Sequence, residues 1–475
     1  IMKIRYYIVS LFALLSITSC SDFLDLTPIS EASSANYYKN TSDINSALTA
    51  CYGSLQGTYQ YGEYFIALME LRSDNVEENS MAGCGESCGN PGGAAGVFYF
   101  IDNFTVTSGN NIIRQAWKEL YNQIYRCNNV LASSHVVANE ELRKQYEGEA
   151  AFLRALAYFN IVRLWGDAPL ILEPIKTVDA VNYGRTPIAD IYKVIEDDLK
   201  DAAKKLEPSY GSDDLGRATS VAAEALLGKV YLTEKKWSDA VALLDNLIQT
   251  YSSQYGLLDN IADVFNVNNE MNKEILFAVR YSKSVIGEGH GYNDYFKDKS
   301  VIYSELKASY GTTDERRDMI EYKKVDANNN VIAKYYDTFD ATTAKVGFDL
   351  PLLRWADVLL MCAEAHNEVA YDGTEDSKAM SSLNLVRGRA KAVTYTSTEL
   401  SDQNSFRKAV LEERRLEFPF ELHRWFDLIR TDTAIDAMAK VGFTITKDDY
   451  LYPLPKTEVD LINNPLTFPQ NPGYN

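Results

Sequence analysis

Hydrophobic residues recur at helical spacing over long stretches of the chain, and this pattern predicts most of the secondary structure. From Ile112 onward, apolar side chains follow the offsets i, i+3, i+4, i+7 and i+8, which place them on one side of a helix. Residues 140–165 carry a second long helical pattern. A third helix is predicted to end near Leu206, with Thr186 as its cap and Pro187 as its first helical residue.

The stretch of residues 219–251 has small and apolar residues at the offsets of a tetratricopeptide repeat, a unit of two packed helices. Gly228 and Ala240 are small enough to let the two helices approach closely, and Tyr231 is expected to fill the space between them. A single repeat cannot bury its own apolar side, because each unit needs neighbours to cover it. We therefore expect the three preceding helices to pack beside this pair.

The helical period fades between residues 272 and 349. Residues 275–279 are continuously apolar and predict a strand, and Gly, Asn, Asp and Tyr dominate the residues that follow. Helical spacing returns after residue 350, including stretches at residues 380–390 and 406–418. The pattern as a whole predicts one mainly helical body with irregular, loop-rich inserts and a few short strands.

Composition and charge narrow the function. The chain has 475 residues, of which 46% are hydrophobic and 24% charged, a globular balance. Its net charge of −19 argues against a nucleic-acid partner and against a polybasic membrane surface. Four scattered His residues do not predict a metal site, and no cofactor motif is legible. The 32 Tyr residues outnumber Phe and Trp, and their rings with polar tips suit amphipathic ligands.

The first twenty residues have the layout of a secretory signal. Lys3 and Arg5 precede a twelve-residue, mostly apolar run that is too short for a membrane-spanning helix. The run ends in Ile17-Thr18-Ser19-Cys20, which resembles a bacterial lipobox. We expect residues 1–19 to be removed and the Cys20 thiol to carry a lipid, whose acyl chains contribute about 0.8 kcal/mol per buried CH₂. An ordinary cleaved signal with an incidental Cys is the alternative.

Four stretches of the chain carry a family resemblance when they are taken together. They are the leader at 20–28, the helix with Trp117, Tyr121 and Asn128 followed by 149–170, the segment 354–390, and the charged run 413–430 with its Pro-rich end at 453–474. Their order and spacing resemble the SusD/RagB family of surface lipoproteins, and the resemblance spans nearly the whole chain after residue 19.

The resemblance implies a SusD-like fold, in which tetratricopeptide-like helical pairs form the scaffold. Residues 20–255 would form an N-terminal region that contains those helices. Residues 256–475 would form a C-terminal region with a loop-rich insert at 272–349 and helices at 350–430, and the two regions would pack as one body.

The resemblance also implies a function without catalysis. Members bind oligomeric nutrients on the outer face of the outer membrane and deliver them to a TonB-dependent, SusC-like transporter barrel. Their ligands are usually oligosaccharides and in some members peptides, and a lipid on Cys20 would anchor this chain. From the residues alone two alternatives stay open: a secreted glycoside hydrolase, whose carboxylate pair sequence cannot identify, and a helical-repeat scaffold for a partner protein.

A sugar-binding surface needs an exposed aromatic ring beside amide or carboxylate groups, because a sugar has an apolar C–H face and a rim of hydroxyls. Residues 59–104 and 281–295 supply this mixture outside the clear helices. The candidate ligand-binding residues are Tyr61, Tyr64, Arg72, Asp74, Asn75, Phe98, Tyr99, Tyr292 and Asn293. The alternative is that these side chains are packed, with residues 97–101 in a buried strand and Asp74-Asn75 in a turn.

Three other groups of residues could be mistaken for catalytic or metal-binding sites. Cys84 and Cys88 lie in a Gly-rich loop and are either a disulfide or two free thiols. Cys362 and His366 continue an apolar helical side and are interpreted as a small core residue and a hydrogen-bonded core histidine. The charged run at 412–430, in which Arg414 and Glu417 are expected to be half buried, is interpreted as a structural ion-pair network rather than a catalytic pair.

Overall fold

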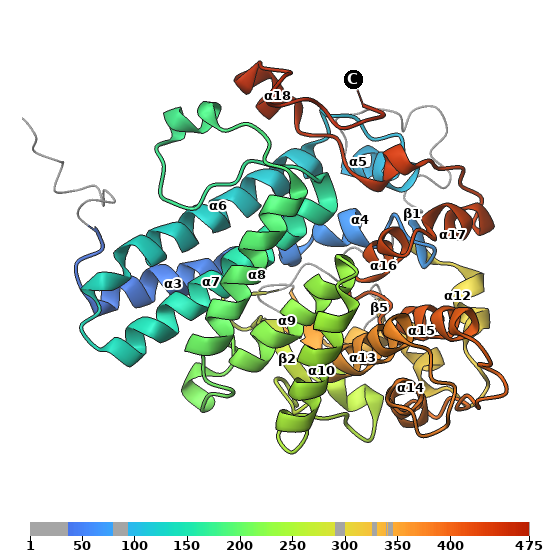
Figure 1. Ribbon diagram of the computed structural model, residues 1–475. Helices are drawn as coiled ribbons and strands as arrows, with labels where there is room; N and C mark the ends of the chain where they lie inside the picture. The colour runs from blue at the N-terminus through green and yellow to red at the C-terminus, as the bar shows by residue number, and fades with distance from the viewer. Residues whose placement is uncertain are drawn as a thin grey trace, which may run out of the picture.

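A continuous row of packed helices forms the larger part of the fold (Figure 1). The computed structural model describes residues 37–78, 94–289, 300–324, 330–338, 340 and 345–474. The row consists of α3 (Thr41–Leu55), α6 (Asn111–Ser133), α7 (Glu140–Trp165), α8 (Ile188–Lys205), α9 (Ser220–Thr233) and α10 (Trp237–Tyr251), each packed on the next. None of these or the other described helices combines the length and the apolarity needed to cross a membrane.

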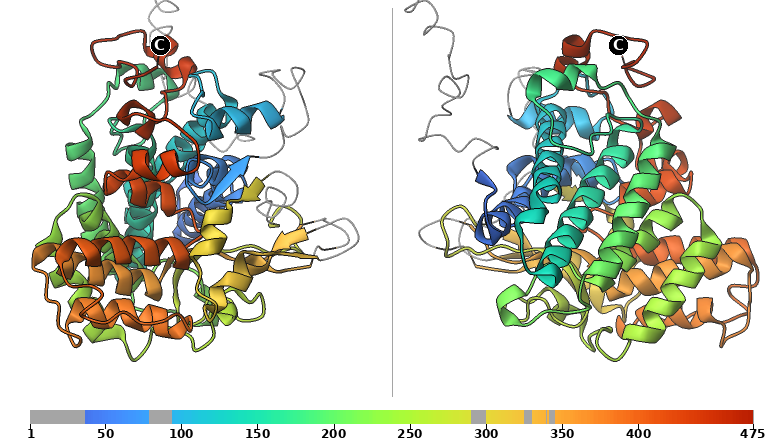
Figure 2. Two further views of the ribbon diagram at one scale, coloured as in Figure 1. Left: turned by 90° about the vertical axis from the view of Figure 1, so that its right-hand side faces the viewer. Right: turned by 60° about the vertical axis from the view of Figure 1, so that its left-hand side comes forward.

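The C-terminal helices continue the row. Helix α13 (Trp355–Val369) packs against α10 and also against α14 (Lys378–Arg389) and α15 (Gln403–Glu417). Figure 2 shows these three helices lying across one end of the row. The short helices are α4 (Phe65–Met69), α5 (Ala94–Asp102), α12 (Ser304–Ser309), α16 (Arg424–Arg430), α17 (Ala434–Lys440) and α18 (Lys456–Ile462).

Side-chain caps explain where two of the long helices begin, and they correct one prediction. The Asn110 side chain accepts hydrogen bonds from the first backbone N–H groups of α6, and Asn139 does the same for α7. Helix α8 has no such cap. Pro187 has extended backbone angles and lies before the helix, so neither the predicted Thr186 cap nor Pro187 as first helical residue is correct. Instead, Asp167 Oδ1 accepts a 2.8 Å hydrogen bond from the Ile188 N–H.

Helices α9 and α10 form the predicted tetratricopeptide-like pair. A Cβ atom on Gly228 would lie 2.7 Å from Leu244 Cδ2, so the absence of a side chain at Gly228 sets how closely the helices approach. Ala240 is fully buried between them. Tyr231 is 8% exposed and also reaches α8, where Lys200 Nζ lies 5.7 Å from its ring centroid.

The described strands form three short antiparallel pairs: β1 (Val76–Glu78) with β3 (Ser300–Ile302), β2 (Ile275–Val279) with β6 (Leu350–Arg354), and β4 (Tyr322–Lys324) with β5 (Asn330–Ile332). The predicted strand at 275–279 is confirmed, and every residue of β2 and β6 is buried. Phe277 packs on α7, with its ring 4.8 Å from that of Phe152. Residues 97–101, considered as a buried strand, lie in α5, where Phe98 and Ile101 share the buried side at a spacing of three.

One continuous hydrophobic cluster joins the beginning and the end of the described chain. It runs from Ile44 in α3 to Phe468 after α18. Trp165, at the end of α7, is fully buried, and its indole N–H donates to the carbonyl of Pro453 at 3.2 Å. The Tyr452 N–H donates to the carbonyl of Leu164 at 2.8 Å, so the C-terminal segment is fixed against the end of α7 by hydrogen bonds on both sides.

Candidate functional site

Three of the predicted ligand-binding residues are buried between the N- and C-terminal parts of the chain. The Arg72 guanidinium lies 3.9 Å from the ring centroid of Tyr452, and its Nη1 donates to the Asp449 carbonyl at 2.6 Å. Asp74 accepts hydrogen bonds of 2.7 and 2.9 Å from Arg424. The Asn75 amide donates to Glu70 at 3.1 Å, and its carbonyl oxygen accepts a 3.1 Å hydrogen bond from Arg415. These contacts hold the fold together, so the placement of Arg72, Asp74 and Asn75 does not support ligand contact.

The electrostatics of Asp74 agree with a structural role. Burial acts to raise the pKa of this carboxyl group, but the charges of Arg424 and Arg415 outweigh it and hold the pKa below its usual value. Loss of either partner of such a buried pair would leave an uncompensated charge, which is strongly destabilising. Asp74 therefore anchors α15 and α16 to the turn before β1.

Two further predicted residues are buried by aromatic packing. Tyr61 is 4% exposed, stacks edge-on against Phe65, and accepts a 2.7 Å hydrogen bond from the Asn160 amide. Phe98 is 2% exposed and contacts Tyr64 with a centroid distance of 5.5 Å. Both rings are packed inside the protein, so their placement does not favour direct ligand contact.

Tyr64 and Tyr99 keep part of their rings exposed, as a binding platform requires. Tyr64 lies 4.9 Å from Tyr59, ring to ring, and burial raises the pKa of its phenol to about 12. Tyr99 and Phe100 follow on α5, with ring centroids 5.9 Å apart. We call Tyr59, Tyr64, Phe98, Tyr99 and Phe100 the N-terminal aromatic cluster.

Polar groups border this cluster. The Asn111 amide donates to the Tyr59 hydroxyl at 3.2 Å, and the Glu119 carboxylate accepts from the Tyr59 N–H at 3.1 Å. Burial raises the pKa of Glu119 to about 7, which leaves its carboxyl group in exchange between two protonation states near neutral pH. Rings beside an amide and a carboxyl group are the mixture that a sugar-binding surface requires. Tyr292, Asn293, Cys84, Cys88 and Cys20 lie outside the described residues.

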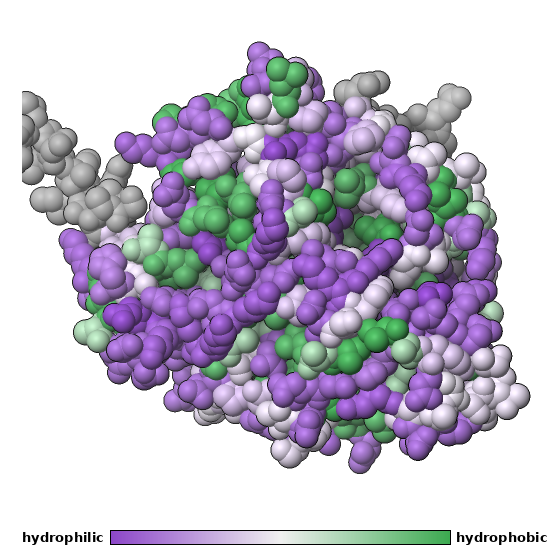
Figure 3. Space-filling model, in the orientation of Figure 1, coloured by the Kyte–Doolittle hydropathy of each residue, from purple (hydrophilic) through white to green (hydrophobic). Residues whose placement is uncertain are grey.

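The structure contains a second surface that sequence reasoning missed. A cavity of 760 Å³ lies between α6, the segment after Pro169, and α18. Trp117, Tyr121 and Tyr125 line it at a spacing of four residues, and Tyr125 is 42% exposed. Figure 3 shows hydrophobic residues gathered beside α6 on this face. The four-residue spacing was visible in the sequence, but it equally describes a helix side that packs in the core.

The charged run at 412–430 forms a structural ion-pair network, as predicted, and it is more deeply buried than expected. The Arg414 side chain is 3% exposed and pairs with Asp357 at 2.7 Å and Asp427 at 2.8 Å. Glu417 pairs with three arginines, and their charges overcome the effect of burial and lower its pKa to about 2. Because the side chains of Arg414 and Glu417 are covered and paired, they are not placed to act on a substrate.

The fold and these surfaces define the class of protein. It is a helical-repeat protein that has aromatic surfaces and whose buried charged residues form ion pairs within the fold. Comparison with known families agrees. A model described as "SusD family" matches residues 279–474, and one described as "Starch-binding associating with outer membrane" matches residues 22–232. The chain belongs to the SusD/RagB family, whose members are non-catalytic binding proteins with a mainly helical fold and a few short strands.

Individual relatives span almost the whole chain. It is 28% identical to a SusD-like protein of Formosa agariphila, over 93% of this chain and 92% of the relative. It is 25% identical to a SusD-like protein of Bacteroides ovatus, over 90% of this chain and 82% of the relative. Among solved structures, it is similar to a laminarin-binding SusD-like protein, with a TM-score of 0.75, 24% identity, and coverage of 92% of this chain and 100% of that one. A surface glycan-binding protein A from Bacteroides fluxus has a TM-score of 0.74, 22% identity and the same coverage.

Proposed function

We propose that this protein binds oligosaccharides at the surface of the outer membrane and passes them intact to a TonB-dependent transporter. The observation that carries the proposal is the N-terminal aromatic cluster, in which Tyr64 and Tyr99 stay partly exposed and Tyr59 is hydrogen-bonded to the amide of Asn111 and the carboxyl group of Glu119. Family membership and the glycan ligands in the names of similar solved structures support it.

The geometry explains how capture would work. The apolar face of a sugar ring would lie on Tyr64 or Tyr99, while its hydroxyl rim would meet Asn111 and Glu119. The supporting contacts between Tyr59, Tyr64 and Phe98 hold these rings in place before ligand arrives. Rings fixed in advance lose little conformational entropy on binding, which increases the affinity gained from each contact.

The membrane anchor and the partner belong to the same proposal. A lipid on Cys20 would tether the mature chain, and a SusC-like barrel would receive the ligand. The family resemblance of the leader at residues 20–28 and the words "associating with outer membrane" in the matching family description support this. Mass spectrometry of the native protein should find an acylated N-terminal Cys20, and an unmodified N-terminus would contradict the anchor without affecting ligand binding.

Incubation with panels of oligosaccharides and peptides tests the binding function. We expect the protein to retain at least one oligosaccharide with its chain length unchanged. Shortened sugars would indicate a hydrolase, and retention of peptides alone would identify a peptide-binding member of the family.

Tyrosine variants locate the site. Tyr64→Ala and Tyr99→Ala should each weaken sugar binding by about 2 kcal/mol, roughly thirtyfold, the cost of removing an aromatic anchor. Tyr37→Ala is the matched control, because its ring is 38% exposed and lies outside the cluster. If Tyr125→Ala abolishes binding while Tyr64→Ala and Tyr99→Ala do not, the cavity beside α6 is the site instead.

A further inference from the structure

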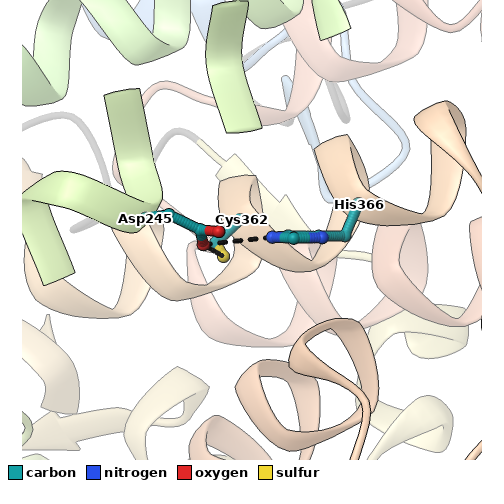
Figure 4. A group of neighbouring side chains, drawn as sticks. All are labelled: Asp245, Cys362 and His366. Atoms are coloured by element: carbon teal, nitrogen blue, oxygen red, sulfur yellow. Dashed lines mark hydrogen bonds and ion pairs between the residues drawn. The ribbon is translucent and has the colours of Figure 1, made fainter. Parts of the chain in front are cut away.

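Three metal-ligating side chains of different types meet where α10 packs on α13. Cys362 and His366 lie one turn apart on α13, and Asp245 reaches them from α10 (Figure 4). The His366 Nε2 atom lies 3.0 Å from Asp245 Oδ1, and the Cys362 thiol lies 3.5 Å from the same oxygen. The three ligand atoms are all within 4.8 Å of one another. The hydrogen bond predicted for His366 is therefore present, but its side chain is 26% exposed rather than in the core.

Two of the three ligand-to-ligand distances can be compared with those of a tetrahedral zinc site. Zinc binds imidazole nitrogen and carboxylate oxygen at about 2.0–2.2 Å and thiolate sulfur at about 2.3 Å, so neighbouring ligands are separated by about 3.4 Å for N···O and about 3.6 Å for S···O. The S···O distance of 3.5 Å already matches, and the N···O distance of 3.0 Å is shorter than the zinc value, so the imidazole and the carboxylate must move apart slightly to hold an ion between them.

The surroundings would allow an ion to enter and would leave one position for water. The side chains of Asp245 and His366 are 32% and 26% exposed, whereas Cys362 is buried behind them. One competing cation is present: Lys378, the first residue of α14, lies with its Nζ 3.3 Å from Asp245 Oδ1. An incoming metal ion must displace this ammonium group.

We propose that Asp245, Cys362 and His366 form a Zn²⁺ site that links α10 to α13, with water as the fourth ligand. On binding, the Cys362 thiol releases its proton to solvent and the sulfur becomes a thiolate ligand. The neutral imidazole moves its proton from Nε2 to Nδ1, so that Nε2 can bind the ion, and the carboxylate of Asp245 binds through one oxygen.

The site would join parts of the fold that are distant in the sequence. Asp245 lies in the tetratricopeptide-like pair, and its two partners lie more than a hundred residues later in α13. An ion held by both helices would bind the folded chain and not the unfolded one, so Zn²⁺ should raise the temperature of unfolding.

Titration with Co²⁺ followed by competition with Zn²⁺ tests the proposal on the full mature chain in the presence of a non-coordinating reductant. We expect one ion per chain, with a thiolate-to-cobalt absorption band in the near ultraviolet and tetrahedral bands in the visible. Cys362→Ser should remove the thiolate band, and His366→Gln should weaken binding at least tenfold.

Two controls distinguish this site from others. The double variant Cys84→Ser/Cys88→Ser and the variant His135→Gln should keep both the band and the affinity, because none of these residues is one of the three proposed ligands. Lys378→Met should tighten Co²⁺ binding, since the competing cation is gone, and this result does not depend on the folding of a ligand variant. Absence of binding at millimolar Co²⁺, a thiolate band that survives in Cys362→Ser, or a Lys378→Met variant with weaker binding would overturn the proposal.

Discussion

Replacement of Arg414 by Met tests whether the buried charges of α15 are structural. Arg414 pairs with Asp357 at 2.7 Å and with Asp427 at 2.8 Å, and the side chains of all three residues are at most 6% exposed. Methionine is similar in length and apolar, so it fills the space but leaves the two carboxylates without this partner. We expect the variant to be less stable and to bind ligand normally once folded.

The free-energy cost of Arg414→Met depends on which other positive partners Asp357 and Asp427 keep. Removal of one member of a buried ion pair costs about 3–5 kcal/mol, because a charge is left buried without its partner. Asp357 keeps Lys229 at 2.6 Å and Asp427 keeps Arg430 at 2.8 Å, so we expect a cost near the lower limit, about 3 kcal/mol. That is a large fraction of the roughly 5–15 kcal/mol that stabilises a typical native protein.

Urea unfolding followed by circular dichroism measures this cost. The matched control is Arg407→Met on the same helix, because Arg407 is 40% exposed and pairs with Glu368 near the surface. Its loss should change the free energy of unfolding by no more than about 1 kcal/mol. An Arg414→Met variant with unchanged stability and lost oligosaccharide binding would refute the structural interpretation and would place Arg414 in the ligand site.

Three further results are expected from the buried carboxyl groups and from one glycine. The pKa of Glu417 is lowered from 4.5 to about 2 in the folded state. The ionised carboxylate therefore stabilises the fold fully above pH 4.5, and this stabilisation is lost as the pH falls toward 2. Thermal unfolding of the wild-type protein measured as a function of pH should show the loss. The pKa of Glu70 is raised by burial from 4.5 to about 7, so the folded state opposes its ionisation, and Glu70→Gln should stabilise the protein by about 1–3 kcal/mol at pH 8 but not at pH 4. Equal effects at both pH values would contradict that origin. Gly166 has φ +74°, and a Cβ atom there would lie 2.9 Å from Leu451 Cδ1. Gly166→Ala should therefore lower the free energy of unfolding by about 1–3 kcal/mol. Gly211→Ala should leave it unchanged, because a Cβ atom at Gly211 would meet no atom within 4 Å.

Hydrophobic spacing was sufficient to predict the helical scaffold. The bounds of α7 and β2 and the close approach of two helices at Gly228 could be predicted from the local sequence. Helical periodicity and small residues at a helix crossing depend on residues that are close together in the chain. The predicted start of α8 was wrong because it depends on a contact that is not local in the sequence. Its first N–H is satisfied by Asp167, a residue outside the helix that only the folded chain brings near.

The candidate sites were harder to predict, because burial depends on partners far away in the sequence. Arg72, Asp74 and Asn75 have the composition of a ligand site, but their partners come from the last seventy residues of the chain. The same is true of Asp245 and His366, whose contact joins two helices with no shared motif. Tyr64 and Tyr99 were proposed as ligand residues because their segment is rich in aromatic residues, although the pattern could not show which rings stay exposed.

A crystal structure of the protein with the oligosaccharide selected from the panel would show whether a sugar is held intact at the N-terminal aromatic cluster. We expect an intact sugar with one ring against Tyr64 or Tyr99 and its hydroxyl groups within hydrogen-bond distance of Asn111 or Glu119. An oligosaccharide bound only in the cavity beside Tyr125, or a cleaved product in place of the intact chain, would contradict it.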